Sequence, residues 1–217
     1  MIKMSKENST KEIFDLAFKN HQRGELKQAE NLLNEILEKS PNHLPSLFLL
    51  GTLSAQIKKY QTAMELLQKA IKIKPDFVEA HNNLGNVFQE LGEYQEATTS
   101  YQSAIKLNPQ YAEAHYNLGK VFQMLKNNLE AQSSYQKVIQ IDFNYINAHN
   151  NLGNVYLELK NYHEARLCFK NAIKLNPNFA EAHNNLGNVL QELSEYQEAT
   201  ICYQGAIKLN PQYADAH

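Results

Sequence analysis

Five of the six prolines in this 217-residue chain lie on one lattice with a spacing of 34 residues. They are Pro41, Pro75, Pro109, Pro177 and Pro211, and Phe143 occupies the one lattice site that has no proline. A fixed period of this length indicates one supersecondary unit that is copied along the chain. Such a solenoid offers a long surface that can hold another molecule, but it does not by itself supply a reaction.

Other residue types follow the same period. When each unit is numbered so that the proline is at position 32, six units span residues 10–43, 44–77, 78–111, 112–145, 146–179 and 180–213. Position 7 is leucine and position 20 is alanine in every unit, and position 24 is large. Position 8 is small, being Ala17, Gly51, Gly85, Gly119, Gly153 and Gly187.

These spacings predict two helices in each unit. Positions 4, 7, 8 and 11 share one helical face, and positions 20, 24, 27 and 28 share another. Small residues at positions 8 and 20 let the helices approach closely, and proline at position 32 ends the second one. Gly24 and Gly92 at position 15 suit the turn between them, although lysine or serine holds that position elsewhere. We therefore expect an all-α solenoid of antiparallel pairs, helix A over about positions 2–14 and helix B over about 18–30.

This pattern resembles the tetratricopeptide repeat family over residues 10–213. The resemblance implies a right-handed superhelix that serves protein–protein interaction. One departure is position 4, often tryptophan in the family, which is Ile13, Leu47, His81, His115, His149 and His183 here. Residues 1–9 are expected to form a flexible tail, and residues 214–217 the start of a truncated seventh repeat. Because Phe143 lacks the proline that would fix the turn between repeats, we expect any local irregularity in superhelical pitch between repeats 4 and 5.

Composition narrows the choice of partner and compartment. The net charge is −2 without a basic block, which argues against nucleic acid and membrane surfaces as partners. No apolar run is long enough for a membrane span, and the polar residues 1–9 do not resemble a secretory signal. Cys168 and Cys202 hold the same position in adjacent repeats, too far apart for a disulfide, so we expect free thiols and a cytoplasmic location.

Asparagines on helix A are the residues that packing explains least. Asparagine is a mediocre helix former, and exposed helix faces usually carry Glu, Lys or Gln instead. A side-chain amide can pair with a backbone C=O and N–H together, so a ladder of amides suits an extended peptide of any sequence. The alternative is a solvated face copied by duplication. The candidate peptide-binding residues, at positions 5, 6 and 9, are Asn82, Asn83, Asn86, Asn117, Lys120, Asn150, Asn151, Asn154, Asn184, Asn185 and Asn188.

Two comparisons within the family refine this interpretation. The carboxylate clamp of co-chaperone domains needs cations at positions 2 and 5, where this chain has Glu113, Tyr116 and Glu181, so a chaperone-tail clamp is disfavoured. The segment HNNLGNVFQELGEYQEA (81–97) instead resembles the superhelical arm of the protein O-GlcNAc transferase family, in which asparagines hold the substrate backbone. The resemblance implies a bacterial arm that recruits substrate for a catalytic domain, and we expect the chain to be part of a longer protein.

No pattern in the sequence indicates catalysis, a metal or a cofactor. The histidines at position 4 are one repeat apart, about 8–10 Å, which is too far for shared ligation of a metal. A structural scaffold is the second hypothesis. It would assemble with itself or nucleate a larger complex through its ends or its convex face. The candidates for an apolar edge at the end of repeat 6 are Leu190, Leu193, Tyr203 and Ile207.

Overall fold

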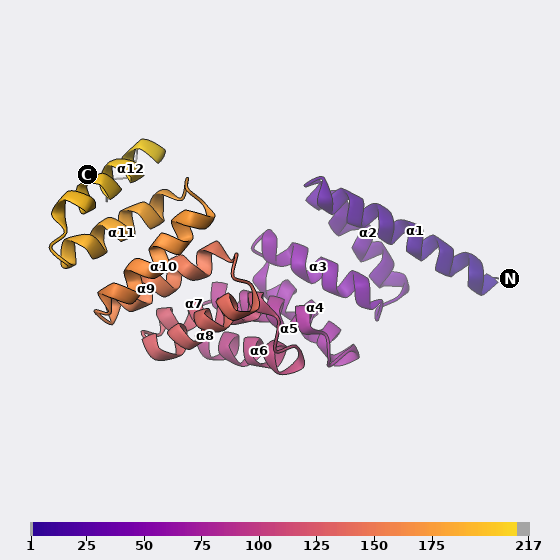
Figure 1. Ribbon diagram of the computed structural model, residues 1–217. Helices are drawn as coiled ribbons and strands as arrows, with labels where there is room; N and C mark the ends of the chain where they lie inside the picture. Colours follow the sequence, from indigo (N-terminus) through magenta and orange to yellow (C-terminus); the bar gives the residue numbers. More distant parts are fainter. Residues whose placement is uncertain (1, 212–217) are drawn as a thin grey trace. The chain divides into compact units, whose positions relative to one another are not determined.

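The computed structural model describes residues 2–211, and the side chains of residues 10–211. These residues form twelve α-helices and no strand (Figure 1). The all-α fold predicted from the sequence is confirmed, and from α2 onward the helix ends lie within one residue of the prediction. The helices are α1 (Ile2–Gln22), α2 (Leu26–Lys39), α3 (Leu44–Gln56), α4 (Tyr60–Ile73), α5 (Val78–Glu90), α6 (Tyr94–Leu107), α7 (Ala112–Met124), α8 (Asn128–Ile141), α9 (Ile146–Glu158), α10 (Tyr162–Leu175), α11 (Ala180–Glu192) and α12 (Tyr196–Leu209).

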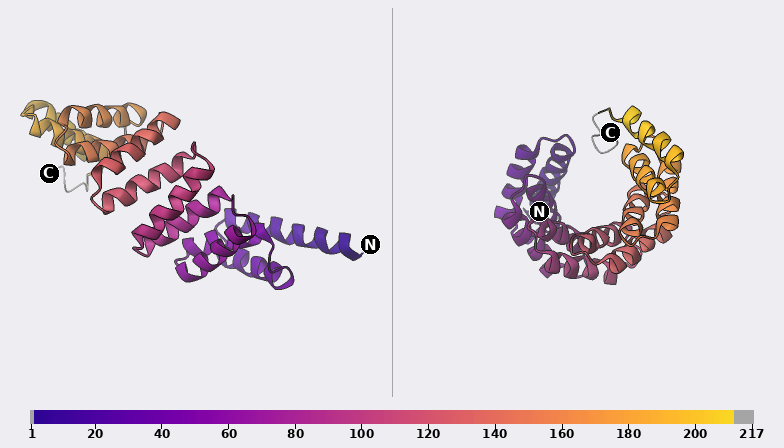
Figure 2. Two further views of the ribbon diagram at one scale, coloured as in Figure 1. Left: turned by 90° about the horizontal axis from the view of Figure 1, so that it is seen from below. Right: turned by 90° about the vertical axis from the view of Figure 1, so that its left-hand side faces the viewer.

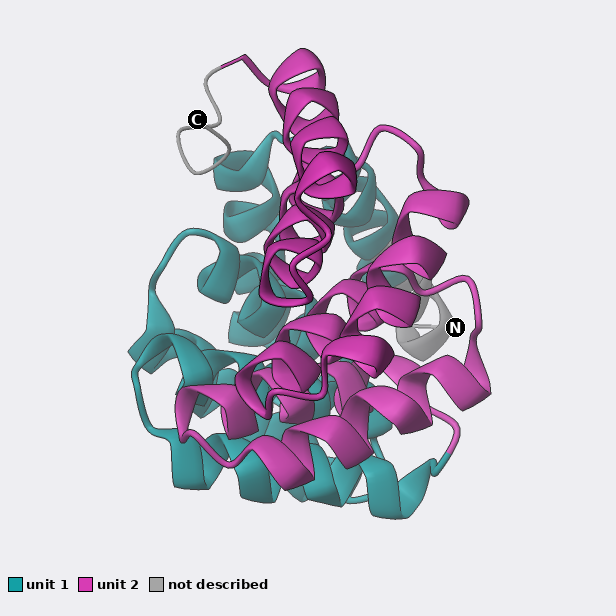
Figure 3. Ribbon diagram, turned by 60° about the vertical axis from the view of Figure 1, so that its left-hand side comes forward, with its two compact units in different colours: residues 1–109 teal, residues 110–217 magenta. Residues whose placement is uncertain are grey.

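The chain divides into two compact units, residues 1–109 and residues 110–217 (Figure 3). Unit 1 contains α1–α6 and unit 2 contains α7–α12, so each holds three helix pairs. Odd-numbered helices are helix A of a repeat and even-numbered helices are helix B. Within each unit the two helices of a pair pack on each other and then on the next pair (Figure 2).

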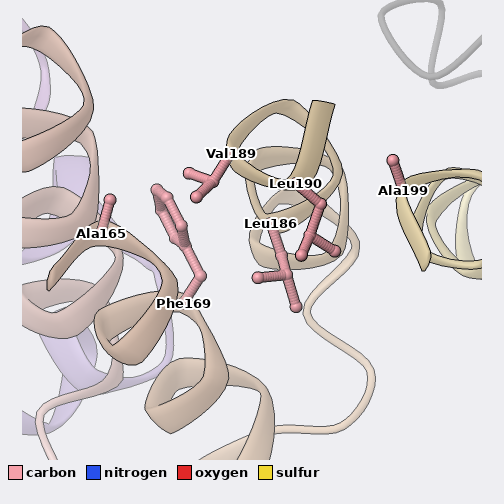
Figure 4. Packing of buried hydrophobic residues seen from close by; sticks show 6 residues of the cluster. All are labelled: Ala165, Phe169, Leu186, Val189, Leu190 and Ala199. Atoms are coloured by element: carbon pink, nitrogen blue, oxygen red, sulfur yellow. The ribbon is translucent and has the colours of Figure 1, made fainter. Parts of the chain in front are cut away.

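Position 8 is where the two helices of a pair come closest. A Cβ atom built on Gly153 would lie 2.6 Å from Cε1 of Phe169, the position-24 residue on helix B. The same contact would be 2.6 Å at Gly85 with Tyr101 and 2.7 Å at Gly119 with Tyr135. The close approach predicted from the small residues is therefore confirmed. The ring is fully buried in each of these three pairs, and Figure 4 shows Phe169 reaching across toward Val189 of α11.

The turn after helix A has one backbone conformation in all six repeats. Its position-15 residue has a positive φ, 77° at Gly24 and Gly92 and between 56° and 62° at Lys58, Lys126, Lys160 and Ser194. At Gly92 the N–H donates to Gln89 O, and the next N–H, of Glu93, donates to Phe88 O. This is the Schellman pattern that closes a helix, and it favours glycine. The variety of residue types at position 15 hid this requirement in the sequence.

Three histidines at position 4 stabilise the turn that precedes helix A by hydrogen bonds to its backbone. Nε2 of His81 donates to Pro75 O at 2.9 Å, and Nε2 of His183 donates to Pro177 O at 3.0 Å. Nε2 of His149 makes the same bond to Phe143 O at 2.9 Å, although Phe143 replaces proline. The backbone bonds around this turn also match those of other turns, since Asp142 N donates to Val138 O at 2.8 Å. The turn at Phe143 thus keeps these hydrogen bonds without proline, and the irregularity in superhelical pitch expected there stays a prediction.

The prediction of a flexible tail at the N-terminus was wrong, because these residues are helical. Helix α1 begins at Ile2, so residues 2–9 extend the first helix and do not form a loose tail before it. Lysine, methionine and glutamate in this segment are good helix formers, which lets the first helix continue in the N-terminal direction. The expected start of a seventh repeat at residues 214–217 lies outside the described residues.

Candidate functional site

The asparagines at position 5 are buried between helices and are not part of the accessible surface. Asn82, Asn150 and Asn184 are 0%, 2% and 3% exposed. In unit 2, Asn150 lies between α9 and α11, and its Nδ2 donates to Glu181 Oε1 at 2.8 Å. The groove position expected for these three residues is therefore corrected, because all three are buried; for Asn150 the contact comes from the next helix A, which a single repeat cannot show.

The asparagines at position 6 join neighbouring helices through their NH2 groups. Nδ2 of Asn185 on α11 donates to Oδ1 of Asn154 at 3.0 Å and to Oδ1 of Asn150 at 3.2 Å, both on α9. Nδ2 of Asn151 donates to the hydroxyls of Tyr116 at 3.1 Å and Tyr135 at 3.4 Å. Within the described residues, the Oδ1 atoms of Asn151 and Asn185 accept no hydrogen bond, and both side chains are half-buried.

The asparagines at position 9 bind their neighbours through the oxygen Oδ1, whereas those at position 6 use the nitrogen Nδ2. Oδ1 of Asn154 accepts from Asn185, and Oδ1 of Asn188 accepts from the Tyr203 hydroxyl at 2.9 Å. Their Nδ2 groups donate to none of the residues that the structure describes. Helices α9 and α11 thus present two half-buried acceptors at position 6 and two half-buried donors at position 9.

The network fixes which way these amides point. The carboxylate of Glu181 can only accept, so Asn150 must turn its NH2 group toward it and its Oδ1 toward Asn185. Asn185 must then give its NH2 group to Asn150 and Asn154, which leaves its own Oδ1 for another molecule. An amide held in this way has already lost its rotamer freedom, which lowers the entropic cost of binding.

Repeat 4 departs from this pattern because Tyr116 and Lys120 stand at positions 5 and 9. The Tyr116 ring centroid lies 5.7 Å from that of Tyr135 and 4.9 Å from that of Tyr145. Burial raises the pKa of all three hydroxyls, that of Tyr145 to about 12, so they are neutral at physiological pH. The ammonium of Lys120 lies 6.0 Å from the Tyr116 ring centroid. Asn117, at position 6 of the same helix, is 8% exposed.

In unit 1, the asparagines of repeat 3 at positions 6 and 9 make the same kinds of side-chain hydrogen bond. Nδ2 of Asn83 donates to Thr52 Oγ1 at 3.0 Å, again from position 6 to position 9 of the preceding repeat. The Tyr101 hydroxyl donates to Asn86 Oδ1 at 2.8 Å.

Sequence reasoning missed an apolar cleft in unit 1. It has a volume of about 250 Å³ and is lined by Phe14, Phe18, Leu44, Pro45, Phe48, Leu49 and Phe77. The signal was present in the sequence, because repeats 1 and 2 carry phenylalanine at position 5, where repeats 3, 5 and 6 carry asparagine.

An open cleft of about 520 Å³ adjoins one of the amides of unit 2, that of Asn188. It is lined by Leu157, Glu158, Lys160, Tyr162, Asn188, Gln191 and Glu192, at the C-terminal ends of α9 and α11. Asn188 therefore borders space that a ligand can enter. The described part of the chain brings no three His, Cys, Asp or Glu side chains together as a metal site.

Cys168 and Cys202 are free, as predicted. Burial raises the pKa of the Cys168 thiol to about 12. None of the helices between residues 2 and 211 combines the length and apolar character that crossing a membrane requires.

Comparison with known proteins identifies the repeats. Models described as TPR repeat match residues 51–92, 85–126 and 153–194, and models described as tetratricopeptide repeat match residues 112–145 and 180–213. No curated protein sequence matches the chain.

Solved structures agree on the fold. PilF of Pseudomonas aeruginosa is 19% identical with a TM-score of 0.84, and the match covers 98% of this chain and 96% of that one. YrrB, described as a TPR protein with an unusual peptide-binding site, is 20% identical with a TM-score of 0.72 over 85% of this chain and 95% of its own. MamA is 24% identical with a TM-score of 0.71 over 76% of this chain and 96% of its own. With most of its length matched by the repeat models, the chain belongs to the tetratricopeptide repeat family.

Proposed function

We propose that this chain is a protein-interaction module that holds an extended peptide on the helix A face of unit 2. The observation that carries the proposal is a set of four half-buried amides on α9 and α11, of which the network anchored by Glu181 orients those of Asn154 and Asn185. Asn151 and Asn185 turn an acceptor outward, and Asn154 and Asn188 turn a donor outward. The proposal assigns binding, and no catalysis, to these residues.

A peptide backbone matches this arrangement. Its N–H groups would donate to Oδ1 of Asn151 and Asn185, and its C=O groups would accept from Nδ2 of Asn154 and Asn188. Neighbouring helices are about 8–10 Å apart and an extended chain advances about 3.3 Å per residue, so each repeat would contact about every third residue. Contacts to the backbone alone leave the peptide's side chains unrestricted. The peptide-binding site described for YrrB, which has a similar fold, supports a peptide as the ligand class.

The site allows a substitution that spares the fold. In Asn154→Asp and Asn188→Asp the inward oxygen that accepts from Asn185 or Tyr203 is kept, and the outward donor becomes an acceptor. Fluorescence anisotropy would measure binding of a labelled pool of dodecapeptides with randomised uncharged residues and blocked ends. We expect the double variant to lose at least about tenfold in affinity, since two donors each contribute about 1 kcal/mol.

The matched control carries the same charge change on other surfaces. Asn171→Asp lies on α10 and Asn178→Asp in the turn before α11. Peptide affinity of this control should equal that of the wild type, and circular dichroism should show both variants folded. Equal affinity of the Asn154/Asn188 variant and its control would contradict the proposal.

The resemblance of residues 81–97 to an O-GlcNAc transferase arm supports a finer proposal, that the bound peptides are transferase substrates. O-linked transfer acts on hydroxyl side chains, and backbone contacts leave side chains unrestricted, so peptides retained from a fully randomised pool should keep the serine and threonine content of the pool. Depletion of these residues would count against the transferase role. The free thiols of Cys168 and Cys202 support a reducing compartment such as the cytoplasm.

Exposed apolar residues on α12 support a second candidate, self-association through this end of unit 2. Tyr196 and Ile201 are 63% and 66% exposed. Leu190, expected from the sequence at this edge, is instead 4% exposed because it packs in the core of unit 2. Light scattering over a dilution series tests this candidate: Ile201→Glu should lower the apparent mass, and a monomer at every concentration would exclude it.

A further inference from the structure

We propose that Lys120 makes the junction of repeats 4 and 5 a subsite for a carboxylate of the bound peptide. This inference rests on the proposed peptide-binding function and assigns the peptide a preferred register and charge. It involves α7 and α9 of unit 2 and the Tyr135 hydroxyl of α8.

The first observation is an excess of hydrogen-bond donors at this junction. At the neighbouring junction, Asn154 at position 9 accepts from Asn185 at position 6 of the next repeat. Between repeats 2 and 3, Thr52 accepts from Asn83 in the same way. Lys120 occupies position 9 of repeat 4, and an ammonium carries three donors and no acceptor.

Because Lys120 has no acceptor atom, the NH2 group of Asn151 donates to other residues. Asn151, at position 6 of repeat 5, gives its NH2 group to the hydroxyls of Tyr116 and Tyr135 instead. The Tyr135 hydroxyl hydrogen is itself donated to Gln123 Oε1 at 2.6 Å. Within the described residues the ammonium of Lys120 has no hydrogen-bond acceptor, and an acceptor on a bound peptide would supply one.

The second observation is that the charge of Lys120 is not balanced. Its side chain is half-buried, and it forms no ion pair with any residue that the structure describes. It is the one cation at positions 2, 5, 6 and 9 of α7, α9 and α11. The two acidic residues at these positions accept hydrogen bonds from other residues. Glu181 accepts from Asn150 at 2.8 Å, and Glu113 accepts from the Tyr111 hydroxyl at 3.1 Å.

Charge selects among the possible acceptors. A backbone carbonyl would satisfy one donor, whereas a carboxylate would also neutralise the ammonium, and charge-assisted bonds are the stronger ones. The carboxylate can belong to a glutamate or aspartate side chain or to the peptide's C-terminus. Both sources present the same group, so the experiment must distinguish them.

The experiment compares three labelled pools of randomised uncharged dodecapeptides with the full chain. One pool has a fixed central Glu and a C-terminal amide, the second has Gln in its place, and the third has the central Gln and a free C-terminus. We expect the wild type to bind the Glu pool about fivefold more tightly than the Gln pool in low salt. The difference should disappear in 0.5 M salt, where the Debye length is about 4 Å. A preference for the third pool would assign the carboxylate to the chain end.

The variant Lys120→Asn restores the residue found at position 9 of repeats 3, 5 and 6, and it should abolish the preference while binding to the Gln pool persists. Its control, Lys170→Asn, removes the same charge from the exposed face of α10 and should keep the preference. Equal binding of all pools to the wild type, or a preference that survives in Lys120→Asn, would overturn the role of Lys120 and leave the proposed function standing. No binding of any pool would overturn both.

Discussion

The contact between Gly153 and Phe169 provides a sharp test of how the helix pairs pack. In Gly153→Ala the added Cβ would lie 2.6, 2.7 and 2.9 Å from Cε1, Cζ and Cδ1 of the Phe169 ring. Ordinary contact begins at 3.4 Å, so the ring must move by roughly 0.8 Å. Phe169 is fully buried, which leaves it little room to do so.

The expected change in the free energy of unfolding follows from two opposing effects. Overpacking a core costs about 1–3 kcal/mol. Replacing glycine by alanine within a helix returns about 1 kcal/mol. We therefore expect Gly153→Ala to lower the free energy of unfolding by up to about 2 kcal/mol, measured by urea denaturation and circular dichroism.

Repeat 1 suggests how the clash can be relieved, because it pairs Ala17 with Leu33 at the same two positions. Phe169→Leu alone should cost about 1–2 kcal/mol by leaving a cavity. In the double variant the alanine methyl fills part of that space, so the two losses should not add, with a coupling of at least about 1 kcal/mol.

Gly205→Ala on α12 is the helix-propensity control. Its added Cβ would meet only the His183 ring, at 3.3 Å from Nδ1 and 3.8 and 3.9 Å from Cγ and Cε1. A ring shift of a few tenths of an ångström relieves this contact, so the variant should stabilise the chain by up to about 1 kcal/mol. The packing account would be refuted if Gly153→Ala stabilised the chain as Gly205→Ala does, or if the two changes at Gly153 and Phe169 were additive.

Three further predictions follow from the turns and the titrating groups. Lys126→Gly should raise the free energy of unfolding by about 0.5–1 kcal/mol, because Lys126 has a φ of 56°, and Gly92→Lys should lower it by a similar amount; urea denaturation measures both. Burial raises the folded-state pKa of Tyr145 to about 12, so its stabilisation is complete below pH 10 and is lost as pH rises toward 12. After discounting for solvent exposure, Tyr145→Phe should reduce this alkaline loss by about 1 kcal/mol in pH-dependent unfolding, and an unchanged profile would contradict the assignment. At pH 8 iodoacetamide should alkylate Cys202 before Cys168, since burial raises the Cys168 pKa to about 12; mass spectrometry of the peptides would show an equal rate if this is wrong.

The sequence was sufficient for the fold because its determinants lie within one repeat. Glycine at position 8 and a large residue at position 24 belong to the same helix pair, so their packing follows from spacing alone. The left-handed turn at position 15 was harder to predict, because Lys58 and Gly92 adopt one conformation with different residue types.

The candidate site was predicted only in part, because it depends on neighbouring repeats. Whether Asn150 is buried is decided by Glu181 on the next helix A, and one repeat does not contain that information. The role of His149 was hidden for a similar reason, since its partner is the carbonyl of Phe143 in the preceding repeat. The outward atoms of Asn185 and Asn188 could be assigned only once the partners of their inward atoms were known.

Recognition of a peptide backbone by the amides of α9 and α11 is the central claim, and altering the backbone alone tests it most directly. A peptide selected for tight binding from the randomised pool would be compared with the same sequence N-methylated at every third residue, in each of the three possible registers. Methylation in the matching register removes the N–H groups proposed to donate to Asn151 and Asn185 and leaves every side chain unchanged. We predict that one of the three methylation registers lowers affinity at least tenfold, since it removes two hydrogen bonds at about 1 kcal/mol each. Equal affinity of the native peptide and all three methylated forms would contradict backbone recognition.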